Sequence, residues 1–143
     1  MANRLSENLS IIYVLKPGDL EAGASGDSIN MGKLHSVTFI LQFAALTGDA
    51  VLTLKSGATD GVETTSESFR YRVADAAQAS ALADNFAAWT IASTLTLTAA
   101  TYQNKTLIVE IDSAVLTAGQ PWLTLVLSAA ASALNAAVLA IGE

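Results

Sequence analysis

The sequence predicts an all-β protein: an antiparallel β-sandwich, jelly-roll-like, with eight or nine strands and at most one short helix. Short apolar runs rich in β-branched and aromatic residues recur along the 143-residue chain, separated by polar or glycine-containing turns. No alternation of strands with long amphipathic helices is visible, which argues against a parallel sheet. Many short strands in a chain of this length are typical of a sandwich or barrel, and two four-stranded sheets fit the count.

The central pair of apolar runs is Val37–Phe43 and Ala50–Leu54. The first is rich in β-branched and aromatic residues, and the second alternates apolar with polar positions. The break between them contains Thr47-Gly48-Asp49, a typical turn segment. We therefore expect these runs to form two neighbouring antiparallel strands joined by a turn.

The other expected strands lie on both sides of this pair. They are Ser10–Leu15, Ser28–Met31, Glu67–Ala74, Trp89–Thr98, Lys105–Asp112, Pro121–Ser128 and Leu134–Ile141. Lys16-Pro17-Gly18-Asp19 should end the first of them, because proline cannot donate a ladder hydrogen bond. The final segment fits a strand or a short helix, and we favour the strand.

The best helical candidate is Asp75–Ala88, which is rich in alanine and begins with a possible capping residue. Its apolar stripe is weak, so an ordered loop with one or two helical turns is the alternative. Residues 1–9 are polar and are expected to form a flexible N-terminal arm, and residues 10–143 a single sandwich domain.

Composition limits the possible function classes. The chain is 52% hydrophobic but only 14% charged, which favours an obligate oligomer or assembly component over a monomer. Thirteen acidic against seven basic residues argue against nucleic-acid binding, which needs a basic face. With no cysteine, disulfides and thiolate sites are excluded. The N-terminus has no signal-peptide pattern, and Trp122–Ile141 fits two strands better than a membrane helix.

The candidates for chemistry are weak, and we assign no catalytic, metal-binding or cofactor-binding residue. His35 is the single histidine and fits a polar residue at the edge of a strand. Glu110 and Asp112 share one strand face, where solvation or an ion pair with Arg70 or Arg72 is the expected role. Three acidic residues of the first loop could gather around a metal ion, but no ligand motif supports this. They are Asp19, Glu21 and Asp27.

Four residues are possible interface anchors. Arg70 and Arg72 flank a tyrosine on one strand, and in an acidic chain we expect them to pair with acids across a strand or subunit boundary. Trp89 and Trp122 are expected in the core or at an interface, because large aromatic side chains dominate both. Exposed tryptophans also stack on sugars, which leaves a carbohydrate-binding module as an alternative.

Several stretches together resemble a family of small structural proteins of tailed-bacteriophage virions, of the capsid decoration (cement) type. They are Lys16–Leu20 after the first strand, Gly26–Met31, His35–Ile40, Phe69–Arg72, Leu107–Asp112 and the alanine-rich closing segment. The resemblance implies a non-enzymatic protein, jelly-roll-like and trimeric, that bridges neighbouring major capsid protein subunits and stabilises the mature capsid. The family's aromatic or basic tail after the last strand is not found here.

From the resemblance we expect the major capsid protein as partner, a homotrimer, and no direct contact with nucleic acid or membrane. The expected location is the capsid surface of the virion, after synthesis in the bacterial host cytoplasm. Residues 75–89 and the N-terminal arm are the segments expected to touch the capsid, since loops usually carry binding. Another virion component, in the neck, tail or fibre, is the alternative within the same class.

Overall fold

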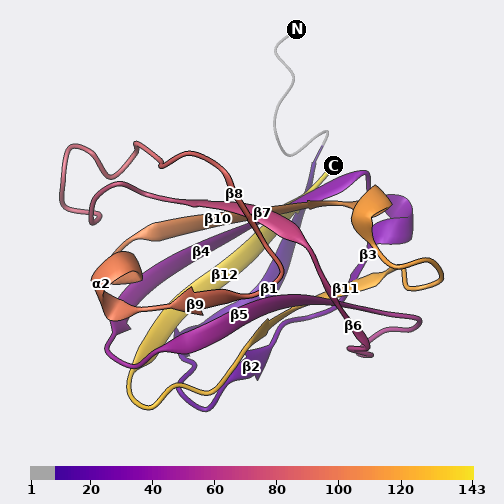
Figure 1. The fold of residues 1–143 in the computed structure, drawn as a ribbon, viewed down its shortest axis with the longest axis horizontal. Helices are drawn as coiled ribbons and strands as arrows, with labels where there is room; N and C mark the ends of the chain where they lie inside the picture. The colour runs from indigo at the N-terminus through magenta and orange to yellow at the C-terminus, as the bar shows by residue number, and fades with distance from the viewer. Residues whose placement is uncertain (1–8) are drawn as a thin grey trace, which may run out of the picture.

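Two antiparallel sheets pack face to face in the computed structural model, which describes residues 9–143 (Figure 1). The first sheet has the strand order β1 (Ser10–Asp19), β12 (Leu134–Gly142), β4 (Ser36–Leu46), β10 (Thr106–Asp112), β7 (Phe69–Val73) and β8 (Thr90–Ala92). The second has β2 (Ala24–Ser25), β11 (Trp122–Leu127), β5 (Ala50–Gly57) and β6 (Thr65–Glu67), with β3 (Ile29–Asn30) beside β11 and β9 (Leu95–Leu97) beside β5. The predicted antiparallel sandwich is confirmed.

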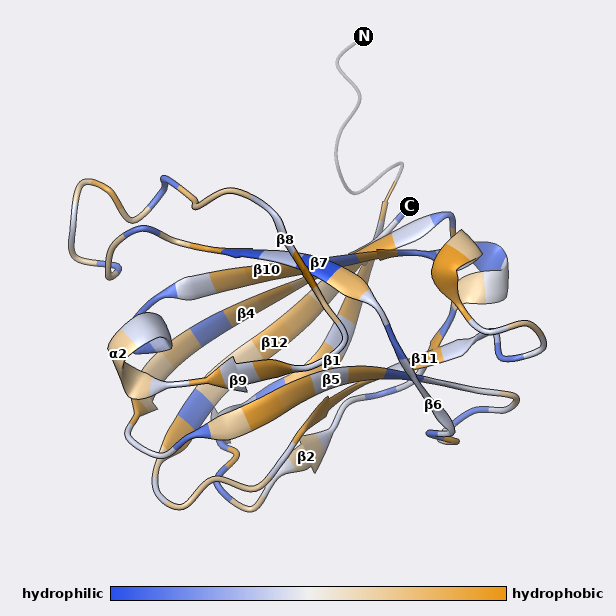
Figure 2. Cartoon of the chain, in the orientation of Figure 1, coloured by the Kyte–Doolittle hydropathy of each residue, from blue (hydrophilic) through white to orange (hydrophobic). Residues whose placement is uncertain are grey.

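Alternating side chains build the core between the sheets. Along β4, Val37, Phe39 and Leu41 are completely buried and point inward, while the residues between them point outward. The second sheet contributes Leu52, Leu54 and Leu125 in the same way. Figure 2 shows the hydrophobic colouring concentrated on β4, β12 and β5. Burial of this many large side chains, at about 1.5–3 kcal/mol each, stabilises the sandwich.

The predicted pairing of the two central strands is wrong. β4 belongs to the first sheet and β5 to the second. The connection at residues 47–49 therefore passes from one sheet to the other instead of making a hairpin. The connection from β11 to β12 makes a similar crossing beside it, and the Thr47 amide donates to the Ala133 carbonyl at 2.9 Å. A Cβ on Gly48 would lie 2.5 Å from the Ser132 amide nitrogen, so the two crossings require glycine there.

Two other expected strands also divide between the sheets. Within Glu67–Ala74, β6 ends in the second sheet and β7 begins two residues later in the first. Within Trp89–Thr98, β8 lies in the first sheet and β9 in the second, with Ser93 and Thr94 between them. These crossings and several strands of two or three residues raise the number of strands in residues 9–143 to twelve, above the eight or nine expected.

The first strand runs past Pro17, against expectation. β1 lies at the edge of the first sheet, where a residue without an N–H breaks no ladder on its outer side. The register shifts between Leu15 and Gly18, so Pro17 occupies an irregular part of the pairing with β12. The expected final strand is confirmed, since β12 pairs with both β1 and β4.

The expected helix at residues 75–88 is wrong, and the alternative of an ordered loop describes it better. This segment forms turns and returns to β7 through an isolated bridge between Ala74 and Phe86. Its alanines bury little surface, and Leu82 remains 54% exposed. The short helix is α2 (Ala99–Tyr102), in a segment expected to be a turn, where Tyr102 packs edge-on against Phe43. The predicted arm, residues 1–9, lies outside the described residues except for Leu9.

Candidate binding surface on the first sheet

Three of the four predicted anchors come together on the outer face of the first sheet. Arg70 and Arg72 point outward from β7, while Phe69 beside them is buried in the core. Trp89 immediately precedes β8, which pairs antiparallel with β7 so that Ile91 lies opposite Arg70. The loop at residues 75–88 brings the tryptophan back to the arginines.

Both guanidinium groups stack on the same indole ring. The guanidinium carbon of Arg70 lies 4.8 Å from the centre of the Trp89 ring, and that of Arg72 lies 4.5 Å from it. Arg72 also lies 5.1 Å from the ring of Phe86. Each cation–π contact at an exposed site contributes about 0.5–1 kcal/mol, so together they hold the loop against β7.

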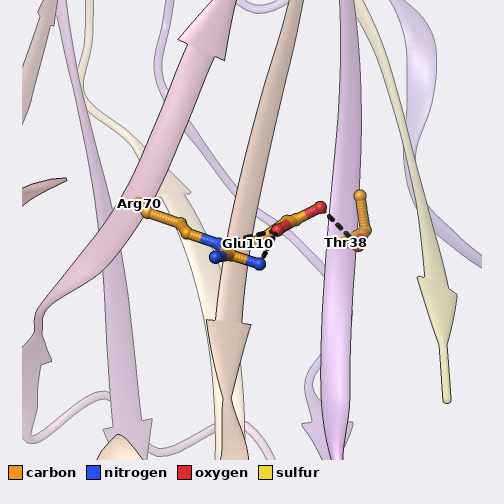
Figure 3. A network of polar contacts seen from close by, with 3 residues as sticks. All are labelled: Thr38, Arg70 and Glu110. Carbon is orange, nitrogen blue, oxygen red and sulfur yellow. Dashed lines mark hydrogen bonds and ion pairs between the residues drawn. The ribbon is translucent and has the colours of Figure 1, made fainter. Parts of the chain in front are cut away.

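Arg70 also makes an ion pair with Glu110 of β10 (Figure 3). Its Nη2 lies 2.6 Å from Oε2 of Glu110, and its Nε donates to the same oxygen at 2.8 Å. Thr38 of β4 donates to the other carboxylate oxygen at 3.5 Å, so the network spans three adjacent strands. The predicted ion pair between Glu110 and an arginine is confirmed; Asp112, on the same face, takes part in neither ion pair of residues 9–143.

Arg72 has a different environment. Neither ion pair within the described part of the chain involves it. Its Nε is buried and has no hydrogen-bond partner among those residues. The cross-strand neighbour of Arg72 is Ile108, an apolar residue. Its positive charge is therefore fixed in place by aromatic rings and is not neutralised by a neighbouring carboxylate.

The outer face of the sheet continues as an apolar row away from the arginines. From Arg72 the cross-strand neighbours are Ile108, Ile40, Leu139 and Tyr13, which reach the opposite edge at β1. Tyr13 is 65% exposed and Ile11, two residues earlier, is 62% exposed. Sequence reasoning missed this row. The signal was available, because most successive residues of Ser10–Leu15 and Leu134–Ile141 are apolar, which puts apolar side chains on both faces of each strand.

The β8 edge of the same face is hollowed. A shallow cavity of about 200 Å³ lies between β7, β8 and the 3-10 helix η2 (Ser113–Val115). Its walls include Phe69, Arg70, Glu110, Ile91 and Val115. Ile91 is 78% exposed, which is high for a large aliphatic side chain.

Trp122 lies away from the other anchors. It belongs to β11 in the second sheet, where it is half-buried and opposite Gly57 of β5. A Cβ on Gly57 would lie 1.8 Å from the Val62 carbonyl oxygen, so the loop after β5 runs directly against this strand. Trp122 is thus part of a tightly packed surface on the second sheet.

One buried carboxyl was missed by the sequence reasoning. Glu67 of β6 is 6% exposed and accepts hydrogen bonds from the Ser56 hydroxyl at 2.5 Å and from the Thr117 amide at 2.8 Å. Burial raises its pKa, but these hydrogen bonds outweigh burial and hold the pKa of Glu67 below its usual value. Glu67 lies two residues before Phe69 in the expected strand, so alternation puts both side chains on the same face. That spacing was the available signal. The carboxylate fastens the loop around Thr117 to the second sheet.

His35 lies beside an open depression of about 640 Å³ between η1 (Met31–Lys33) and η2. Its amide donates to the Glu143 carbonyl at 2.6 Å, and its carbonyl accepts from Ser113 at 2.8 Å. At the end of β1, the Asp19 carboxylate accepts a hydrogen bond from the Glu21 amide at 2.9 Å. Nowhere in residues 9–143 do three His, Cys, Asp or Glu side chains gather in an arrangement that could hold a metal ion. Of the helices in this range, none has the length and apolar character needed to cross a membrane.

Comparison with known proteins gives a match in fold. No protein-family model matches the sequence, and no curated protein matches it either. Among solved structures, the chain is similar to the SPBc2 prophage-derived protein YomS, with a TM-score of 0.55 and 10% sequence identity. The alignment covers 94% of this chain and 92% of YomS. The two proteins therefore share the sandwich fold over nearly their whole lengths.

Proposed function

We propose that this chain is a non-enzymatic structural protein of a tailed-phage particle, which decorates the mature capsid and stabilises it by bridging major capsid protein subunits. The observation that carries the proposal is the end-to-end match in fold to a protein whose name marks it as prophage-derived. The motif resemblance at residues 16–20, 26–31 and 107–112, noted independently in the sequence, points to the same class.

The physical properties of the sandwich support such a role. A clamp between capsid subunits has to resist the outward pressure of packaged DNA, and a sandwich with a continuous leucine-rich core deforms little. A protein that binds the mature lattice and not its dissociated subunits stabilises the lattice by mass action. As the proposed homotrimer, it would hold three capsid contacts at once and gain avidity without any single tight contact.

Binding to capsids tests the proposal. Recombinant protein is added to mature capsids that lack it, prepared from the phage or prophage that encodes the chain. We expect saturable binding in a fixed ratio to the major capsid protein and release of DNA at a higher temperature. Capsids prepared before maturation serve as the control and should bind less. Failure to bind mature capsids at micromolar protein would contradict the proposal.

A neck, tail or fibre component is the second candidate, because the fold match to a prophage-derived protein favours a phage protein without distinguishing the part of the particle. Such a component would bind tails or necks and not the capsid surface. The two candidates are separated by locating gold-labelled protein on particles by electron microscopy. Label spread over the whole head supports decoration, and label at one vertex or on the tail supports the second candidate.

A further inference from the structure

The outer face of the first sheet carries two different exposed patches, one at each edge. The β1 patch consists of Ile11, Tyr13 and Leu139, exposed by 62%, 65% and 39%. The β8 patch consists of Trp89, Ile91 and Val115, exposed by 38%, 78% and 47%. Five strand spacings of about 4.8 Å place the patches about 24 Å apart, so neither can cover the other within one copy.

Each patch exposes large apolar side chains that water solvates poorly. Exposed large apolar side chains that cluster in this way mark interaction surfaces on small proteins. In a contact between two copies, one patch of each copy would be buried, with the polar residues around it forming the rim. The low charged fraction of the chain, 14%, agrees with burial of surface against a partner.

The two patches differ in shape in a complementary way. At the β8 edge, the cavity of about 200 Å³ between Arg70, Ile91 and Val115 provides a recess. At the β1 edge, Tyr13 stands on the outermost strand of the sheet and is the most exposed aromatic side chain of residues 9–143. A tyrosine ring fits a recess of this size. The guanidinium of Arg70 in its lining can contact an aromatic occupant, and the carboxylates of Glu110 and Asp112 line it as well.

The two edges also carry opposite charges that are not neutralised within the copy. Arg72, beside Trp89, makes no ion pair with any described residue. Asp27 lies next to β1, because its amide donates to the Val14 carbonyl at 3.1 Å. Its side chain is exposed and takes part in neither ion pair found in residues 9–143. The β1 edge therefore offers an exposed carboxylate, and the β8 edge offers a guanidinium beside an aromatic ring.

We propose that the β1 patch of one copy docks onto the β8 patch of another copy of this chain, with Tyr13 in the recess beside Ile91 and Asp27 facing Arg72. The two surfaces are different, so the contact is heterologous and each copy uses both of its edges. Contacts of this kind repeat from copy to copy and close into a ring when the rotation allows. The contact is between copies of the chain and does not depend on the capsid.

The test uses two variants that each block one edge. Tyr13→Asp blocks the β1 patch, and Ile91→Asp blocks the β8 patch; both positions are exposed, so the fold should be retained. By analytical ultracentrifugation at tens of micromolar, we expect wild-type protein to be larger than a dimer and each variant alone to be a monomer. An equimolar mixture of the two variants should form a heterodimer, because one native contact remains between them.

Val51→Asp is the matched control, since Val51 is 37% exposed but lies on the outer face of the second sheet. It should associate as the wild type does. Circular dichroism and urea unfolding of all three variants confirm that they are folded. A monomeric wild-type protein, a mixture that stays monomeric, or equal loss of association in Val51→Asp would each overturn the proposal. A monomeric wild-type protein would also contradict the proposed homotrimer, but binding of the chain to mature capsids is measured separately and would stand or fall by its own result.

Discussion

Arg72 and Trp89 are stacked, with the guanidinium carbon 4.5 Å from the centre of the indole ring, although the long loop at residues 75–88 lies between them in sequence. The same ring lies 4.8 Å from the guanidinium carbon of Arg70. One tryptophan thus holds two like charges side by side on the sheet surface. Glu110 pairs with Arg70, so Arg72 is the arginine at this edge that makes no ion pair with a described residue.

Replacing this tryptophan should loosen the loop without unfolding the sandwich. We expect Trp89→Ala to lower the free energy of unfolding by about 1–2 kcal/mol, the sum of two exposed cation–π contacts. Arg72→Gln should cost about half as much. In a double-mutant cycle measured by urea unfolding, the coupling between the two positions should be about 0.5–1 kcal/mol. Additivity of the two single effects within about 0.3 kcal/mol would contradict a direct contact.

The ion pair of Arg70 with Glu110 is expected to contribute little to stability. Because Arg70 is largely exposed, Glu110→Gln should lower the free energy of unfolding by less than about 1 kcal/mol. The difference from wild type should shrink further when NaCl is raised from 50 mM to about 1 M, where the Debye length is about 3 Å. A loss that persists in high salt would show that the glutamate acts through packing and not through its charge.

Glu67 should make stability depend on pH in the acid range. Its folded-state pKa lies below the reference value of 4.5, so its carboxylate stabilises the fold fully above that value. This contribution is lost as pH falls from 4.5 through the lower folded-state pKa. Glu67→Gln should cost about 1–3 kcal/mol at pH 7 and much less near pH 3. Urea unfolding at both pH values measures the difference, and an equal cost at both would refute the assignment.

Gly57 should tolerate no side chain. A Cβ there would lie 1.8 Å from the Val62 carbonyl oxygen and 2.6 Å from the carbonyl carbon, both backbone atoms that cannot rotate away. We expect Gly57→Ala to cost at least about 1–3 kcal/mol, in the range of overpacked sites. Gly32→Ala is the control, because its Cβ would meet a movable side-chain oxygen of Asn30 at 3.0 Å. Thermal unfolding of the two variants should differ clearly, and equal melting temperatures would contradict the geometry.

Local sequence patterns predicted part of the fold. Alternation identified which residues of Val37–Phe43 face the core, and it placed Arg70 and Arg72 on the outer face of their strand. It did not reveal which strands pair. The Thr47-Gly48-Asp49 segment has the composition of a hairpin turn, yet β4 and β5 lie in different sheets because their inward side chains meet across the core.

The candidate surface could be predicted only in part, for a similar reason. Arg70 and Arg72 were expected to meet acids, and Glu110 does pair with Arg70. The approach of Trp89 to both arginines depends on how residues 75–88 return to β7, which no short-range pattern specifies. The sequence identifies Ile91 and Tyr13 as residues of expected strands and does not reveal that they are exposed. Their exposure follows from their position at sheet edges, and only the strand order gives that position.

The copy number of the protein in purified virions tests the proposed role most directly. Quantitative mass spectrometry of particles from the encoding phage, with isotope-labelled peptides of this chain and of the major capsid protein as standards, measures the ratio of the two. We predict a high, constant ratio, as expected for a protein that covers the capsid lattice. Absence from the particles, or only a few copies per virion, would contradict capsid decoration.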